Sequence, residues 1–246
     1  MFEGLKEALQ YANKLKEESM QPIVTEIAGK TYCNKDLARY GMEDLAEAIH
    51  VNTLSAMVDY ITGKREELRE KMILHIVSPK EVSLYSGLLK ERNRETLFVC
   101  DAIVNEFQFD KYYDQERFLI ELQANFAEND DLRTIMQVAG NIQAGTTASY
   151  SDDGISQKTT IKSGVERLDV QVPNPVKLIP YRTFAEIEQP SSLYVFRVKD
   201  DGNGAPMFKL VEADNGLWKH AVMLKIKDYF EHELADAYKE NLTIIA

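Results

Sequence analysis

The chain has 246 residues, of which 29 are Lys or Arg and 40 are Asp or Glu, so its formal net charge is −11. Its 44% apolar and 28% charged residues are typical of a globular protein and exclude collagen, a coiled coil and a wholly disordered chain. The negative charge argues against nucleic acid as the main partner, because phosphate binding needs a basic surface. An acidic surface serves either solubility alone or the binding of a basic surface on another protein.

The sequence indicates a cytoplasmic protein without a membrane span. No stretch approaches the roughly 18 consecutive apolar residues that a membrane helix requires. Residues 1–7 include acidic side chains and lack the apolar core of a signal peptide. The two cysteines, Cys33 and Cys100, are far apart in the chain, which indicates reduced thiols, with a disulfide or a catalytic thiol as the alternatives.

Residues 1–21 are predicted to form an N-terminal amphipathic helix. Phe2, Leu5 and Leu9 recur at helical spacing among Lys and Glu residues, and Pro22 ends the pattern. The apolar face either docks on the core or mediates self-association. In the second case we expect Phe2, Leu5 and Leu9 to be the self-association contacts of a homo-oligomer.

Residues 22–142 are predicted to form an α+β core. A continuous apolar run at 71–77, rich in β-branched residues, predicts a buried strand, and two later helices joined by a short Asn/Asp turn predict a helical hairpin. The expected order is a hairpin at 23–32, a helix at 54–61, strands at 71–77, 82–85 and 96–100, and helices at 114–127 and 131–142.

Residues 143–190 differ from the core in composition. They begin with a Thr/Ser-rich stretch in which Asp153-Gly154 predicts the turn of an exposed β-hairpin. Pro173, Pro175 and Pro180 then indicate an extended edge segment and not a central strand, because proline cannot donate to a sheet. The region is either an arm that reaches a neighbouring subunit or a part of the core.

Residues 191–246 are predicted to complete the core with a β-hairpin and a C-terminal helix. Strands at 193–198 and 207–212 flank a turn, a long helix spans 215–239, and a short strand follows at 242–245. Because the strands come in runs and do not alternate with helices, the sequence predicts an α+β fold with a mostly antiparallel sheet.

No residue pattern in the chain identifies a catalytic or metal site. The histidines, His50, His75, His220 and His232, lack the spacing of paired metal ligands. Glycine-rich phosphate-binding motifs are also missing from the sequence. We therefore expect no catalytic residue, no metal and no cofactor.

The segment from Pro180 to Pro190 places Arg182 among aromatic residues, with two glutamates close behind. In one interpretation this arginine is paired with a carboxylate and stacked on a neighbouring ring. In the other it binds an anionic ligand or a carboxylate of a partner. The surface residues that we expect to make such contacts are Gln157, Tyr181 and Arg182.

Several segments resemble, in sequence and order, a family of phage and prophage proteins of Gram-positive hosts. The resemblance covers residues 50–246 and extends more distantly to the prophage YfdQ-type family. The segments that carry it are Thr53–Ile61, Glu81–Tyr85, Asp152–Gln157, Pro173–Val176, Pro180–Pro190 and Ala213–Trp218.

This resemblance implies an early phage protein that acts on host machinery. We expect a non-enzymatic accessory protein in the host cytoplasm that works as a homo-oligomer. It would bind and inhibit or redirect a host protein, such as a defence nuclease or the signal of that nuclease. The alternatives are an accessory factor in phage DNA recombination or replication, and a metal-dependent enzyme acting on nucleotides or nucleic acid.

Overall fold

The computed structural model of the chain divides into two units, Met1–Leu45 and Ala46–Ala246. Within 149–171, and at Asp200, it describes the backbone alone. The residues that it describes are 2–36, 45–63, 71–90, 92–142, 149–152, 157–163, 166–171, 174–235 and 241–246.

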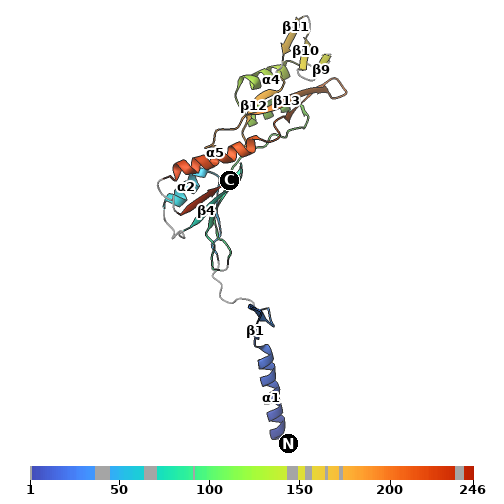
Figure 1. Cartoon of the computed structure of the whole chain (residues 1–246). Coiled ribbons are helices and arrows are strands. Elements are labelled where there is room, and N and C mark those ends of the chain that lie inside the picture. The colour runs from blue at the N-terminus through green and yellow to red at the C-terminus, as the bar shows by residue number, and fades with distance from the viewer. Residues whose placement is uncertain are drawn as a thin grey trace. The chain divides into compact units, whose positions relative to one another are not determined.

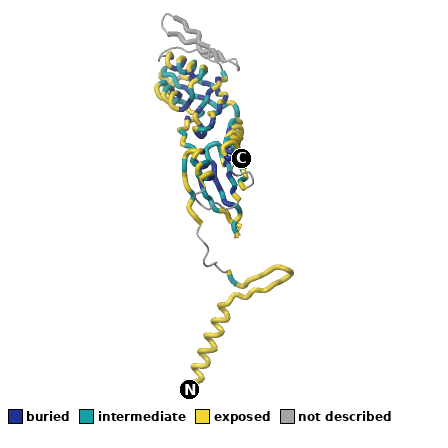
Figure 2. The backbone as a smooth tube through the Cα atoms, turned by 90° about the vertical axis from the view of Figure 1, so that its left-hand side faces the viewer, coloured by how far each residue is buried: buried dark blue, intermediate teal, exposed yellow. Residues whose placement is uncertain are grey.

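The first unit consists of a helix and a β-hairpin, as the sequence predicts. Helix α1 spans Phe2–Met20, and strands β1 (Val24–Ile27) and β2 (Lys30–Cys33) pair in antiparallel fashion. Ala28 and Gly29 have φ angles of 54° and 75°, which suit a tight turn between the strands. All residues of these three elements are exposed (Figure 2).

One five-stranded sheet of the second unit has the order β15-β4-β5-β6-β3. Strands β4, β5 and β6 form an antiparallel meander, whereas β15 pairs parallel to β4 and β3 pairs parallel to β6. The bounds are β3 Ile49–Val51, β4 Met72–Ser78, β5 Glu81–Ser86, β6 Thr96–Asp101 and β15 Leu242–Ile245.

Helices α2 (Leu54–Gly63) and α5 (Trp218–Glu233) pack on this sheet, as Figure 1 shows. Every second residue of β4 from Met72 to Ile76 is buried, so the strand turns one side of its pleat toward the helices. The helices contribute residues at helical spacing. The buried residues from these three elements are Met72, Leu74, Ile76, Leu54, Met57, Ile61, Val222, Ile226 and Phe230.

The other five-stranded sheet has the order β7-β14-β13-β12-β8 and is antiparallel throughout. Helices α3 (Gln115–Asn125) and α4 (Asp130–Asn141) cover it, and Phe118 of α3 stacks on Phe208 with ring centroids 5.3 Å apart. The strand bounds are β7 Tyr113–Asp114, β8 Phe126–Ala127, β12 Val176–Pro180, β13 Ser192–Asp200 and β14 Pro206–Glu212.

Both covering helices begin at a capping side chain. Asp114 accepts a hydrogen bond from the amide of Arg117 at 2.8 Å, and Asn129 accepts one from the amide of Leu132 at 2.8 Å. A separate three-stranded sheet of the order β11-β10-β9 lies between β8 and β12 in the sequence. Its strands are β9 Ser149–Asp152, β10 Gln157–Ser163 and β11 Glu166–Gln171.

The predicted α+β class with mostly antiparallel pairing is confirmed. The expectation of an edge segment is wrong for β12, which lies between β13 and β8. Pro180 is the last residue of this strand, so it removes no donor from the strand interior. Helix α5 spans Trp218–Glu233, shorter than the predicted 215–239, and residues 236–240 lie outside the described ranges.

The division between the two units falls after Leu45, whereas the sequence placed the first boundary at residue 21. The hairpin β1–β2 belongs to the first unit with α1. Phe184 and Ile187 are buried in the core under α5, so this part of the 143–190 segment belongs to the core. Within the described ranges, no helix combines the length and the apolar content needed to cross a bilayer.

The two free cysteines should differ sharply in reactivity. Cys33 is exposed, whereas Cys100 is buried in β6, and burial, followed by the charges of Glu186 and Asp101, raises the pKa of its thiol to about 12. Because the thiolate is the reactive form, a thiol reagent at pH 8 should label the native protein only at Cys33. The Cys33→Ser variant should therefore show no rapid labelling by mass spectrometry. Rapid labelling of Cys100 in the native protein would contradict the burial of its thiol.

Candidate functional site

A cavity of about 450 Å³ lies in the second unit where the ends of several elements meet. Its walls come from the β4–β5 turn, the loop before β7, the end of α3, the end of β12, the end of β14 and the start of α5. The lining residues are Ser78, Pro79, Lys80, Asn105, Glu106, Phe107, Phe109, Asn125, Pro180, Tyr181, Arg182, Glu212, Trp218 and Lys219.

The guanidinium group of Arg182 is held by a dense set of hydrogen bonds. One terminal nitrogen donates to the Tyr194 hydroxyl at 3.0 Å and to the Glu212 carboxylate at 2.9 Å. The other donates to the Pro190 carbonyl at 3.2 Å and to the Ser192 hydroxyl. Arg182 is only 6% exposed, so the Glu212 carboxylate compensates a charge that is almost removed from water.

Gln189 fixes the loop that carries Arg182. Its side-chain oxygen accepts hydrogen bonds from the amides of Arg182 (2.9 Å) and Thr183 (3.3 Å). Its side-chain nitrogen donates to the carbonyls of Phe184 (3.1 Å) and Ile187 (3.2 Å). The Gln189 side chain therefore supplies hydrogen-bond partners to backbone groups of this loop, which is not part of a β-sheet.

Trp218 lies over the guanidinium group, whose central carbon is 3.7 Å from the centroid of a Trp218 ring. The preceding turn contains Gly216 at a φ of 73°, and the Gly216 amide donates to Asp214 at 3.2 Å. A β-carbon on Gly216 would lie 3.5–3.7 Å from the end of the Lys219 side chain. Lys219 therefore folds back over Gly216, and its ammonium lies 6.0 Å from the Trp218 ring.

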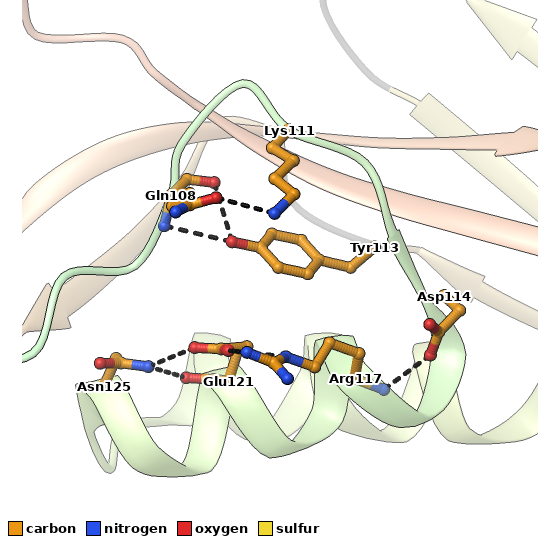
Figure 3. Close-up of polar contacts among 7 residues, drawn as sticks. All are labelled: Gln108, Lys111, Tyr113, Asp114, Arg117, Glu121 and Asn125. Carbon is orange, nitrogen blue, oxygen red and sulfur yellow. Dashed lines mark hydrogen bonds and ion pairs between the residues drawn. The ribbon is translucent and has the colours of Figure 1, made fainter.

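Asn125 contributes an oriented amide at the end of α3 (Figure 3). Its nitrogen donates to the Glu121 carbonyl at 2.9 Å and to the Glu121 carboxylate at 2.8 Å. Arg117 donates to the other oxygen of that carboxylate at 2.8 Å. The amide oxygen of Asn125 consequently faces away from Glu121, as Figure 3 shows.

The loop that carries Phe107 and Phe109 is also tied down. The Tyr113 hydroxyl accepts from the Gln108 amide and donates to the Gln108 carbonyl, both at 3.2 Å, and Lys111 donates to the Gln108 side chain at 2.8 Å (Figure 3). Burial is the main cause that raises the pKa of Tyr113, so this phenol stays neutral. The two phenylalanine rings pack 5.0 Å apart.

Three buried polar atoms of cavity-lining residues have no hydrogen-bond partner among the described residues. They are the Asn125 amide oxygen, the Arg182 Nε and the Trp218 Nε1. A buried polar atom without a partner costs about 1–3 kcal/mol. The site therefore combines an acceptor and two donors to which no residue that the structure describes forms a hydrogen bond.

Burial also sets the ionisation at this site. It lowers the pKa of the Arg182 guanidinium, while Tyr194 and Glu212 act in the opposite direction. Burial likewise raises the pKa of the Tyr194 phenol. At the rim, the hydrogen bond and the charge of Lys80 lower the pKa of Glu106, so this ion pair is charged at neutral pH.

The sequence-predicted residues are placed in different parts of the chain. Tyr181 and Arg182 both line the cavity, Tyr181 in an exposed position and Arg182 in a buried one, although we expected both at the surface. Gln157 is the first residue of β10, and its side chain lies outside the description. The self-association candidates Phe2, Leu5 and Leu9 belong to α1 in the first unit, and all three are exposed.

Sequence reasoning missed Asn125, Lys219 and the contact of Trp218 with Arg182. Trp218 packs beside the core under α5 and also covers the Arg182 guanidinium. The only local signal was the turn-forming Asn215-Gly216 pair directly before Leu217 and Trp218. Within the described ranges, no group of three or more His, Cys, Asp or Glu residues could hold a metal ion.

Comparison of the chain with family models, with curated proteins and with solved structures gives no match. The relation to phage and prophage proteins therefore stays a prediction.

Replacing Glu212 by Gln should destabilise the protein, because the buried Arg182 charge would lose its compensating carboxylate. Glu212 is about one-quarter exposed, so we expect the free energy of unfolding to fall by about 2 kcal/mol, less than for a fully buried pair. Glu188→Gln is the matched control, since it removes an exposed carboxylate paired with Lys225 and should leave stability almost unchanged. Equal losses in denaturant unfolding of the two variants would contradict a structural role for the Arg182–Glu212 pair.

Proposed function

We propose that the chain is a non-enzymatic, homo-oligomeric binding protein and that the cavity beside Arg182 is its binding site. The observation that carries this proposal is the presence of three unpartnered, buried polar atoms on residues that line one cavity. A bound molecule that supplies an acceptor for the two donors and a donor for Asn125 would recover the cost of leaving them unpaired. The volume of the cavity falls in the ordinary range of small-ligand sites, roughly 300–1,000 Å³.

The arrangement of the site favours binding over turnover. Arg182 is fixed by Glu212, Tyr194, Ser192 and Pro190, and such a rigid group suits recognition because it loses little side-chain entropy when a ligand binds. The lining carboxylates of Glu106 and Glu212 are both engaged in ion pairs with lining cations. These contacts position charges around the cavity and leave the carboxylates paired.

The biological setting of the proposal comes from the resemblance to phage and prophage proteins. In that setting, the protein acts in the cytoplasm of the host cell and inhibits or redirects host machinery. The size of the cavity favours a small molecule as the bound target, such as the signal on which a host defence protein depends. The alternative target is the host protein itself, which the chain would then bind directly.

The proposal is tested by isolating the tagged full-length chain from phage-infected host cells and recording native mass spectra. We expect a stoichiometric small-molecule adduct on the wild-type chain that is lost on denaturation. Lys219→Glu at the cavity should lose the adduct, whereas Lys225→Glu, farther along α5, should retain it. A protein partner at near-equal amount would instead identify a host protein as the target, and nucleic acid detected at 260 nm would favour the recombination role.

Self-association is expected to depend on the apolar face of α1. Phe2, Leu5 and Leu9 are 90%, 59% and 58% exposed, and burying such side chains against a second copy removes apolar surface from water. Replacing all three by Ser should convert the oligomer to a monomer in light scattering coupled to size-exclusion chromatography.

The matched control for this experiment replaces Glu7, Lys14 and Glu18 by Ser, because these residues lie on the opposite face of the same helix. It should leave the oligomeric state unchanged. A wild-type chain that is monomeric at all concentrations, or dissociation in both triple variants alike, would contradict self-association through the apolar face.

A further inference from the structure

We infer that the ligand of the cavity beside Arg182 is an aromatic anion that also carries an N–H or O–H donor, of about the size of a nucleoside monophosphate. This inference rests on the proposed binding function and names the chemistry of the molecule that would occupy the site. It follows from three separate features of the lining: its charges, its rings and its unpartnered polar atoms.

The charges of the lining favour an anion. Three cationic side chains and two carboxylates face the cavity, and the carboxylates of Glu106 and Glu212 are paired with Lys80 and Arg182. Lys219 is the remaining cation, and no ion pair joins it to any residue that the structure describes. In a chain with a net charge of −11, this excess of positive charge in a concave site favours a negatively charged ligand.

The rings of the lining favour an aromatic ligand. Phe107, Phe109, Tyr181 and Trp218 all contribute to the walls, together with two prolines. Tyr181 is 45% exposed and Trp218 is half-buried, so both have ring surface that a ligand can cover. Flat apolar walls of this kind bind a planar ring by stacking, with charged groups outside the ring plane.

The unpartnered atoms determine the polar groups of the ligand. Asn125 presents its amide oxygen as an acceptor, because Glu121 fixes the amide nitrogen, and this oxygen requires a donor on the ligand. Arg182 Nε and Trp218 Nε1 are donors and require acceptors, which an anionic oxygen or a ring nitrogen supplies. Trp218 lies over the Arg182 guanidinium, so a ligand that reaches Arg182 Nε must displace the Trp218 ring.

This displacement gives a direct probe, because Trp218 is the only tryptophan of the chain. We would titrate the full-length protein with the four common nucleoside monophosphates and with an aromatic carboxylate, 4-hydroxybenzoate, and follow tryptophan emission excited at about 295 nm. Uncharged adenosine and 4-hydroxybenzamide are the matched neutral probes. We expect at least one anion to change the emission with a Kd below about 1 mM, and its neutral counterpart to bind at least tenfold more weakly.

Two lysines of the same helix provide the matched variants. Lys219→Ala removes the cation at the cavity and should weaken anion binding by about tenfold, with little effect on the neutral probes. Lys225→Ala removes a lysine that pairs with Glu188 outside the cavity and should leave the affinity unchanged. Lys219 is exposed, so loss of folding is not expected to obscure the result.

The outcomes separate the ligand class from the proposed function. Binding of a monophosphate or of the carboxylate supports the inference and shows which anion the site prefers. Equal affinity for the neutral probes, or equal weakening by both lysine variants, overturns the anionic class while leaving a binding cavity in place. If no probe changes the Trp218 emission at about 1 mM, the inferred class is overturned, whereas a native adduct would still support the binding function.

Discussion

The burial of one arginine constrains the whole second unit. Arg182 lies two residues after Pro180, the last residue of β12, and its guanidinium group must find compensating contacts because an unpaired buried charge is strongly unfavourable. These contacts come from Ser192 and Tyr194 on β13 and from Glu212 at the end of β14. The arginine therefore fixes how the chain leaves one sheet.

The same loop then reaches the other hydrophobic core. Phe184 and Ile187 are buried with α2, α5 and the β4–β5–β6 meander, whereas Tyr194 belongs to the core under α3 and α4. Thr183 reinforces this connection, because its hydroxyl donates to the Pro79 carbonyl in the β4–β5 turn at 2.6 Å. The cavity forms where these elements meet around the Arg182 side chain, and so its walls come from distant parts of the sequence.

Local patterns predicted most of the elements but little of the site. The apolar run at 71–77 and the stripe of α2 specify a strand and a helix because burial acts on each element separately. The prolines led to the wrong prediction that β12 is an edge strand, because the effect of a proline depends on its position in the strand. The partners of Arg182 could not be read from the sequence, because Glu212 is 30 residues away and its proximity results from strand pairing.

The burial of Arg182 also raises the question of why polar groups line the cavity. A well-packed apolar side chain in place of a buried ion pair is often neutral or stabilising, so the Arg182–Glu212 pair is weak evidence for a stability role. Among the described residues, one guanidinium N–H of Arg182 has no hydrogen-bond partner, and the same holds for the Trp218 N–H and the Asn125 amide oxygen. All three of these atoms belong to residues that line one cavity. The proposed ligand would supply partners for these atoms, whereas the orientation of Asn125 follows from its hydrogen bonds to Glu121.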